Sequence, residues 1–177
     1  MIDNKKNIIL VGTLRAYSYI NKIILEKLLP SDYEVYFHLL ITNQIESTLS
    51  AYERYIYDKL NGKVYPRISR VDYLNKSYDG FHMAISKYSN NDYFKNNQLF
   101  IRGKNKTLPR EIYYKGDVNE AIKEEERRQL KNINNQTVLN RINSIYDYLD
   151  TSDEINEFNN VCEKVLKLNL KTRKDVY

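Results

Sequence analysis

The chain has little of what disulfide-rich, metal-cluster and membrane proteins require. Its 177 residues include one Cys, two His, five Gly and no Trp. A single Cys excludes an intrachain disulfide framework and a multi-cysteine metal cluster, and two His exclude a His-rich metal site within one chain. No stretch approaches the ~20 uninterrupted apolar residues of a transmembrane helix, and the polar residues 1–7 do not resemble a secretory signal. We therefore expect a cytoplasmic protein.

The composition is that of a folded protein with a modest positive charge. Apolar residues make up 42% of the chain and charged residues 29%, which argues against wholesale disorder. The length suits a single domain that can bury a real core. The formal charge of +5 and the pI of about 9.0 permit nucleic-acid or phosphate binding without demanding it.

The first forty residues predict a βαβ unit. Residues 7–12 (NIILVG) form a short apolar, β-branched run that ends at a glycine, as a buried strand does. Ser18 is a candidate N-cap of an amphipathic helix that ends at Pro30. Residues 34–41 (EVYFHLLI) are almost continuously apolar, which predicts a strand buried on both faces of a parallel sheet and places His38 in the core. Two strands around one helix make a right-handed crossover.

The rest of the chain alternates helices with short strands. The periodicity predicts helices over residues 44–60, 80–88, 117–130 and 138–149, a short helix after Thr151 or Ser152, and strands over 63–71, 98–102 and 165–170. Pro66 makes its segment an edge strand or a bulge. We therefore expect a single α/β domain over residues 1–177. It has a mostly parallel twisted sheet flanked by helices, Rossmann-like, with a helical insertion in the last third.

The loop after the first predicted strand is a candidate anion site. Gly12, Thr13, Leu14 and Arg15 lie between the carboxyl end of that strand and a helix N-terminus, where open α/β sheets bind ligands. Arg15 would add a bidentate contact to a phosphate or a carboxylate. Neither G-x-G-x-x-G nor the Gly-Lys-Ser/Thr of a P-loop is present. The alternative is an ordinary βα turn with a surface arginine.

The other candidate residues each have a structural alternative. Asp175, after the last predicted strand, offers one carboxylate to Mg²⁺ or Mn²⁺, or else belongs to a charged, frayed terminus. His82 lies on a predicted helix and is a candidate general base, although nothing in the sequence places a nucleophile beside it. Cys162 is expected to be a small buried hydrophobe.

Segments from both ends of the chain together resemble a known family. Residues 8–17 (IILVGTLRAY) and 34–38 (EVYFH) resemble the start of polysaccharide- and lipopolysaccharide-type glycosyltransferases with a GT-A fold. Residues 134–149 (NNQTVLNRINSIYDYL) and 165–177 (VLKLNLKTRKDVY) resemble their later helix and a strand that ends in Lys-x-Arg-x-Asp, a variant of the Asp-x-Asp metal motif. The resemblance covers only the nucleotide-binding half of such an enzyme.

The resemblance assigns a nucleotide-sugar donor site to the two ends of the chain. It implies that Gly12, Thr13 and Arg15 contact the nucleotide. It further implies that Arg173 offsets the leaving-group charge and that Asp175 holds Mn²⁺ or Mg²⁺. Arg173 replaces the first Asp of the motif, and the chain stops two residues after Asp175. The resemblance therefore implies part of a transferase of polysaccharide synthesis, either from a truncated gene or as a piece of a longer chain, or else a domain that binds the nucleotide-sugar without transferring the sugar.

Two other classes of function stay open at this point. A small basic nucleic-acid-binding protein, or a phage-encoded interaction or inhibitor protein without enzymatic activity, would account for the positive charge, the 17 Tyr residues and the helical last third. A small structural or partner-binding α/β protein would need no chemistry. Of these hypotheses we favour the transferase.

Overall fold

Two hydrophobic cores, rather than one, form along the chain. The structure is a computed structural model that describes residues 6–12, 17–89, 91–94, 96–102 and 108–167. Unit 1 comprises Met1–Thr42 and Lys76–Arg128, and unit 2 comprises Asn43–Asn75 and Gln129–Tyr177. In the described part of the chain, no helix combines the length and the hydropathy that a membrane span requires.

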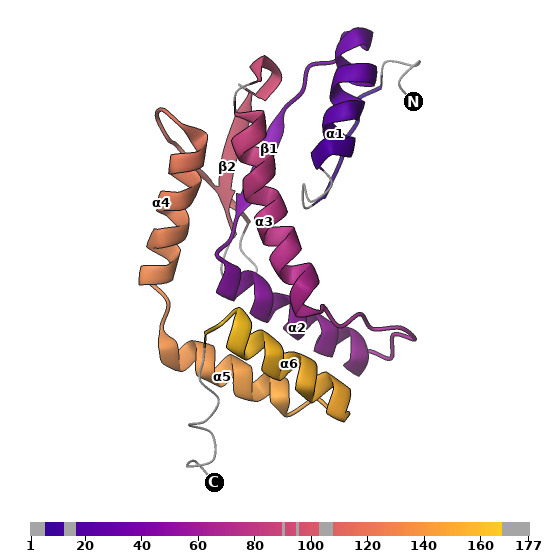
Figure 1. Cartoon of the computed structure of the whole chain (residues 1–177), viewed down its shortest axis with the longest axis vertical. Coiled ribbons are helices and arrows are strands. Elements are labelled where there is room, and N and C mark those ends of the chain that lie inside the picture. Colours follow the sequence, from indigo (N-terminus) through magenta and orange to yellow (C-terminus); the bar gives the residue numbers. More distant parts are fainter. Residues whose placement is uncertain (1–5, 13–16, 90, 95, 103–107, 168–177) are drawn as a thin grey trace. The chain divides into compact units, whose positions relative to one another are not determined.

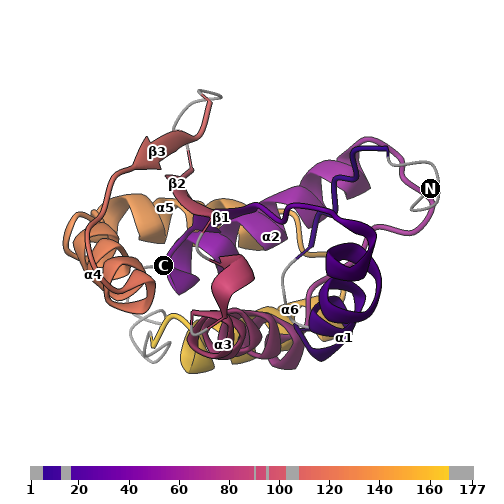
Figure 2. The same cartoon turned by 90° about the horizontal axis from the view of Figure 1, so that it is seen from above.

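Unit 1 is built on a three-stranded sheet with the order β1-β2-β3 (Figures 1 and 2). β1 (Phe37–Ile41) and β2 (Asn97–Ile101) are parallel, and β3 (Arg110–Ile112) is antiparallel to β2. The predicted α/β class is confirmed in this form, as a helix-rich fold with a small mixed sheet. The mostly parallel sheet of a GT-A-like half was a wrong expectation for the described residues.

β1 is buried on one face only. Phe37, Leu39 and Ile41 are buried, whereas His38 and Leu40 are exposed. The predicted burial on both faces, with His38 in the core, was wrong because a continuous apolar run does not reveal which face a helix covers. The ring of His38 instead stacks on an aromatic ring of β2, with the ring centroids 5.5 Å apart.

Helices from three parts of the chain pack on the buried face of this sheet. The first part is α1 (Tyr17–Ile23), which continues through the π-helical η2 (Ile24–Leu28) and the 3-10 helix η3 (Leu29–Ser31). The second is the end of α3 (Val71–Tyr88) with the short η4 (Asp92–Phe94), and the third is α4 (Val118–Lys131). The predicted helix that ends at Pro30 and the predicted helix over 117–130 are confirmed. The buried core residues come from η2, β1, α3, η4, β2 and α4: Ile24, Leu28, Phe37, Leu39, Ile41, Ala84, Ile85, Tyr88, Phe94, Leu99, Val118 and Ile122.

Three predicted strands are not formed in the described residues. Residues 7–12 adopt no regular structure, and residues 63–70 are irregular up to the start of α3. Residues 165–167 follow the last helix, where Val165 and Leu166 are buried and their N–H groups bond to the carbonyl of Val161. A strand needs a neighbouring strand for its backbone hydrogen bonds, and a local apolar pattern cannot supply one.

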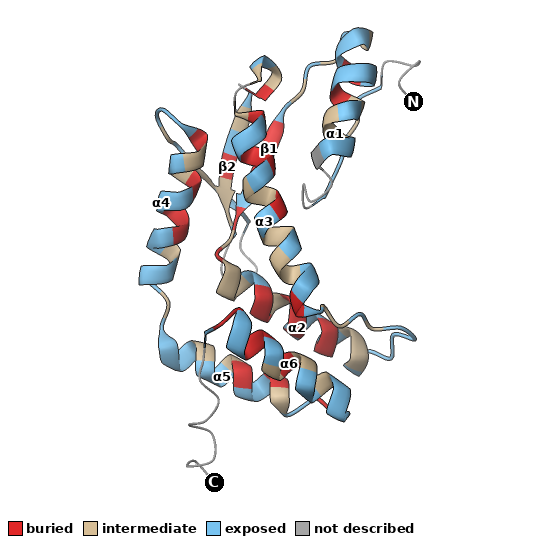
Figure 3. Ribbon diagram, viewed as in Figure 1, coloured by how far each residue is buried: buried red, intermediate tan, exposed pale blue. Residues whose placement is uncertain are grey.

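Unit 2 is a three-helix arrangement of α2 (Gln44–Leu60), α5 (Asn135–Tyr146) and α6 (Ser152–Lys164). The buried positions of each helix fall on one side, as the red segments in Figure 3 show. Phe158 of α6 contacts Tyr52 of α2 and Tyr146 of α5, with ring centroids 4.6 and 4.8 Å away. Cys162 is buried in the same core, as predicted.

Local signals set the ends of these helices. The side chain of Asn43 accepts a hydrogen bond from the N–H of Glu46 and begins α2, and Gly62, with φ of +70°, follows its C-cap. Thr151 caps α6 in a capping box with Glu154. The predicted helix over 44–60 and the predicted cap at Thr151 are confirmed.

We predict that Tyr52→Phe raises the free energy of unfolding. Tyr52 is fully buried, and its hydroxyl has no hydrogen-bond partner among the described residues, so the folded state bears an uncompensated desolvation cost. Removing the hydroxyl should stabilise the protein by about 1 kcal/mol in urea unfolding. Tyr55→Phe is the matched control, because the Tyr55 hydroxyl bonds to Glu154 and its loss should destabilise. A loss of stability in Tyr52→Phe would contradict this account.

Candidate functional site

The site residues predicted from the sequence fall mostly outside the described part of the chain. Thr13, Arg15, Arg173 and Asp175 belong to segments that the structure does not describe. Gly12 is described: it is exposed, lies on an irregular segment, and a Cβ built on it would meet nothing within 4 Å. Its neighbourhood therefore imposes no steric need for glycine. Whether these residues contact a ligand remains a prediction.

The structure offers no metal centre in its described ranges. Within them, no group of three or more His, Cys, Asp or Glu side chains is placed to hold a metal ion. The predicted ligand, Asp175, lies beyond these ranges, so the predicted Mn²⁺ or Mg²⁺ has no counterpart to compare.

His82 lies beside a buried carboxylate in unit 1. Its Nε2 is 3.2 Å from Oε1 of Glu126 on α4, and the Glu126 side chain is only 11% exposed. Burial, and then a hydrogen bond to Glu126, raise the pKa of Tyr78. A carboxylate that orients an imidazole is the usual support of a general base. The other ring contacts of His82 are edge-on packing against Tyr78 and Phe81, so in this structure the cluster joins α3 to α4.

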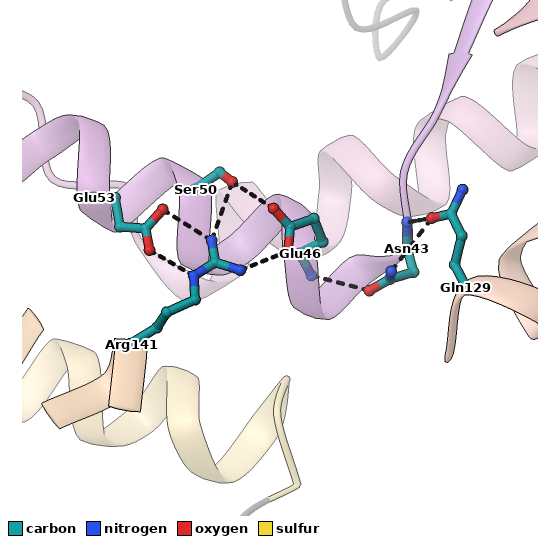
Figure 4. A network of polar contacts seen from close by, with 6 residues as sticks. All are labelled: Asn43, Glu46, Ser50, Glu53, Gln129 and Arg141. Carbon is teal, nitrogen blue, oxygen red and sulfur yellow. Dashed lines mark hydrogen bonds and ion pairs between the residues drawn. The ribbon is translucent and has the colours of Figure 1, made fainter. Parts of the chain in front are cut away.

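Arg141 is held by two carboxylates of α2 (Figure 4). Its Nε and Nη2 donate to the two oxygens of Glu53 at 2.6 and 2.8 Å, and its Nη1 donates to Glu46 at 2.5 Å. The hydrogen bonds to Glu53 raise the pKa of Arg141 above its usual value against the effect of burial, and Glu46 adds to the rise. The guanidinium is fully occupied in tying α5 to α2, so it is not free for a ligand.

A second network in unit 2 centres on Glu154. Its carboxylate accepts hydrogen bonds from the Tyr55 hydroxyl, from Lys59 Nζ at 3.0 Å, and from the N–H groups of Thr151 and Asp150 at 2.9 and 2.8 Å. Burial alone would raise the pKa of Glu154, but these hydrogen bonds lower it to about 2. The network joins the end of α2 to the start of α6.

We predict that Glu154 makes stability fall in acid. Its pKa is about 2 in the folded protein against an ordinary value of 4.5, so its stabilisation is complete above about pH 5 and is lost as the pH falls to 2. Glu154→Gln should lower the free energy of unfolding by about 2 kcal/mol at neutral pH and flatten this acid slope. Urea unfolding from pH 6 to 2 measures both. Glu163→Gln, on an exposed position of α6, is the control; an unchanged slope in Glu154→Gln would refute the assignment.

A pocket of about 450 Å³ opens beside α6 in unit 2. Its lining contains four carboxylates, on Asp72, Asp153, Glu154 and Glu157, and one cation, Arg70. Glu157 also accepts a hydrogen bond from the backbone N–H at the start of α3, at 2.7 Å. Carboxylates repel phosphate groups, so this pocket is not suited to the phosphates of a nucleotide.

The segment from residue 54 to residue 70 carries most of the net charge of the chain. It has five cations and one carboxylate, a formal +4 against +5 for all 177 residues. Lys59 and Lys63 are ion-paired, with Glu154 and Asp58 respectively. Arg54 and Arg67 are exposed, and neither guanidinium has an ion pair or a hydrogen bond with a described residue. The sequence alone does not single these two arginines out; the signal it contains is the single carboxylate among the 17 residues from 54 to 70.

The chain matches the model of a known protein family. Residues 1–112, which is more than half of the chain, match the family model described as Zeta toxin, a family with a P-loop kinase-like fold. No curated protein and no solved structure matches the chain.

The match corrects the glycosyltransferase hypothesis. It includes the Gly-x-Leu-Arg motif at residues 12–15 and ends before the Lys-x-Arg-x-Asp motif at 171–175, so it assigns the first of the two motifs to a family other than the glycosyltransferases. Sugar transfer, a polysaccharide pathway and a GT-A metal site are therefore wrong interpretations, and the match gives no support to the nucleic-acid-binding or inhibitor alternative either. The chain belongs to the Zeta toxin family.

Proposed function

We propose that the chain takes part in phosphoryl transfer from a nucleoside triphosphate, as the nucleotide-contacting part of a kinase-like toxin. The match of residues 1–112 to the Zeta toxin family carries this proposal, because the fold of that family is that of P-loop kinases. Phosphoryl transfer depends on positioning and on positive charge around the phosphates rather than on covalent chemistry by the protein. The question for this chain is which of its groups supply that charge.

The usual phosphate loop is not available in this sequence. A P-loop reads Gly-x-x-x-x-Gly-Lys-Ser/Thr, and its Lys and Ser/Thr serve the phosphates and Mg²⁺. The two Gly-Lys pairs, at residues 62–63 and 103–104, are followed by Val64 and Asn105, and neither has a glycine five positions earlier. Contacts from this chain to the phosphates must therefore come from other groups.

Arg54 and Arg67 fit that role best. Both lie within the matched residues, both are exposed, and neither is neutralised by a carboxylate in the described structure. A guanidinium binds phosphate oxygens in a bidentate manner and keeps its charge at any physiological pH. Arg70 is also exposed but lines the acidic pocket, which weakens its attraction for phosphate.

The loop from Gly12 to Arg15, in unit 1, is proposed as an anion site separate from Arg54 and Arg67, which belong to unit 2. It lies inside the matched residues, and its sequence offers backbone N–H groups and one guanidinium to an anion. Mg²⁺, when bound with the triphosphate, would supply charge neutralisation, and it prefers one or two carboxylates together with phosphate oxygens.

We predict that Arg54→Ala and Arg67→Ala each weaken binding of ATP or GTP about tenfold or more. Each substitution removes charged hydrogen bonds to phosphate, of roughly 1.5–3 kcal/mol. Binding of the full chain to ATP or GTP with Mg²⁺ is measured by calorimetry and by thermal unfolding, where a hundredfold excess over the dissociation constant adds about 2.7 kcal/mol of stability.

Two arginine variants serve as controls for this experiment. Arg70→Ala removes another exposed cation from the same segment, and Arg127→Ala removes one that is paired with Glu124 on α4. Neither should change nucleotide affinity by more than about twofold. The proposal fails if no nucleotide binds the folded chain, or if all four variants lose affinity equally.

A further inference from the structure

A group of exposed apolar side chains lies around the end of α2 in unit 2. Tyr57, Leu60, Val64 and Tyr65 are 67%, 64%, 79% and 83% exposed, and residues 60–65 are exposed without interruption (Figure 3). Tyr57 and Leu60, three positions apart on the helix, are neighbours on one side of it. Single apolar residues on a surface are normal, whereas a group of them marks a surface that binds a protein or a membrane. We call these four residues the apolar turn.

The backbone of the apolar turn is set by the end of α2. The N–H of Gly62 bonds to the carbonyl of Lys59 at 3.2 Å, and the N–H of Lys63 bonds to the carbonyl of Asp58 at 3.0 Å. These two bonds, with the positive φ of Gly62, are those of a Schellman motif. Lys63 Nζ also binds the carboxylate of Asp58 at 2.7 Å. The last two apolar side chains therefore follow directly on a turn with a defined backbone.

The charge of the segment that contains the apolar turn is positive. Residues 54–70 carry five cations and one carboxylate. That carboxylate, on Asp58, is paired with Lys63. Arg54 and Arg67, which flank the apolar turn in the sequence, are exposed and have no ion pair or hydrogen bond with a described residue. A partner of this surface must therefore offer negative charge together with an apolar environment.

A bilayer with anionic lipids has both properties. Its phosphate groups attract Lys and Arg, and its interfacial region takes up the Tyr rings and aliphatic side chains of a protein that lies on it. A fluid surface adapts to side chains that project from a turn, whereas a folded protein partner would need a matching shape. We propose that the apolar turn, together with Arg54 and Arg67, binds the surface of a membrane that contains anionic lipids, with Val64 and Tyr65 inserted between the headgroups.

This inference goes beyond the proposed function and does not depend on it. Phosphate is common to a lipid headgroup and a nucleotide, so Arg54 and Arg67 suit either ligand. The apolar side chains separate the two, because a triphosphate has no use for Val64 and Tyr65. Substitutions at these two positions should therefore weaken membrane binding and leave the affinity for ATP unchanged.

Sedimentation of the full chain with lipid vesicles measures the binding. Vesicles of phosphatidylcholine with roughly one-third phosphatidylglycerol should bind at least about tenfold more tightly than phosphatidylcholine alone, and salt should weaken this binding. The double substitution Val64→Ser and Tyr65→Ser keeps every cation and should weaken binding about tenfold. Leu108→Ser with Tyr113→Ser is the matched control, because these residues of unit 1 are 86% and 88% exposed and should contribute nothing.

The absence of Trp from the chain allows a direct measurement of insertion. In Tyr65→Trp the fluorescence emission should shift to shorter wavelength when anionic vesicles are added, because the indole ring leaves water. Lipids brominated on their acyl chains should quench this emission. Tyr113→Trp should show neither effect. Adsorption through charge alone would leave the emission of both variants unchanged, so this readout separates insertion from general attraction by a positive chain.

Three results would overturn the inference. The first is equal binding to anionic and uncharged vesicles, and the second is unchanged emission of Tyr65→Trp on anionic vesicles. The third is binding of poly-glutamate that is lost in the double variant of Val64 and Tyr65 while vesicle binding is not, which would assign the turn to an acidic protein. Binding of ATP with Mg²⁺ is measured on the same variants. Vesicle binding without nucleotide binding would remove the proposed function alone, and arginine-dependent nucleotide binding without vesicle binding would remove this inference alone.

Discussion

The pairing of β1 with β2 is the contact on which unit 1 depends. It sets Phe37 opposite Asn97, and the whole crossover through α2 and α3 lies between those two residues in the sequence. Parallel strands without a covered face are not stable, so the pairing also fixes where the helices of unit 1 must pack. Among the described strands the other side of β1 has no partner, and such an edge is one that proteins normally cover or pair.

Charge pairing organises unit 2 in a comparable way. Arg141 neutralises Glu46 and Glu53, and Lys59 neutralises Glu154. The exposed arginines of residues 54–70 face water, where their charge attracts anions over roughly a Debye length of 8–10 Å. Arg54 and Arg67 have no ion pair or hydrogen bond with the described residues, which is the physical reason to propose a ligand for them.

Helices were predictable from the sequence because their signals are local. Residues 44–60 carry their own period, an N-cap at Asn43 and a stop at Gly62, and the structure has the helix with those bounds. Strands were less predictable, since each depends on a partner that the local sequence does not name. β2 was found within one residue of its bounds, whereas residues 7–12, 63–70 and 165–167 had strand-like patterns and no partner. The predicted burial of His38 was wrong for the same reason, because the helices that cover one face of β1 decide which of its residues are buried.

The candidate site shows the same limit in chemical terms. Gly12 to Arg15 suggested an anion loop from its composition alone, and any family that binds phosphates after a strand can present such a loop. Four residues therefore fitted a nucleotide-sugar site and a kinase-like fold equally well, and only the match over 112 residues separates the two. The arginines at 54 and 67 went unnoticed because isolated cations resemble ordinary surface charge until their neighbours are known. Whether a cation is paired depends on which carboxylates lie near it in space, and only the fold shows that.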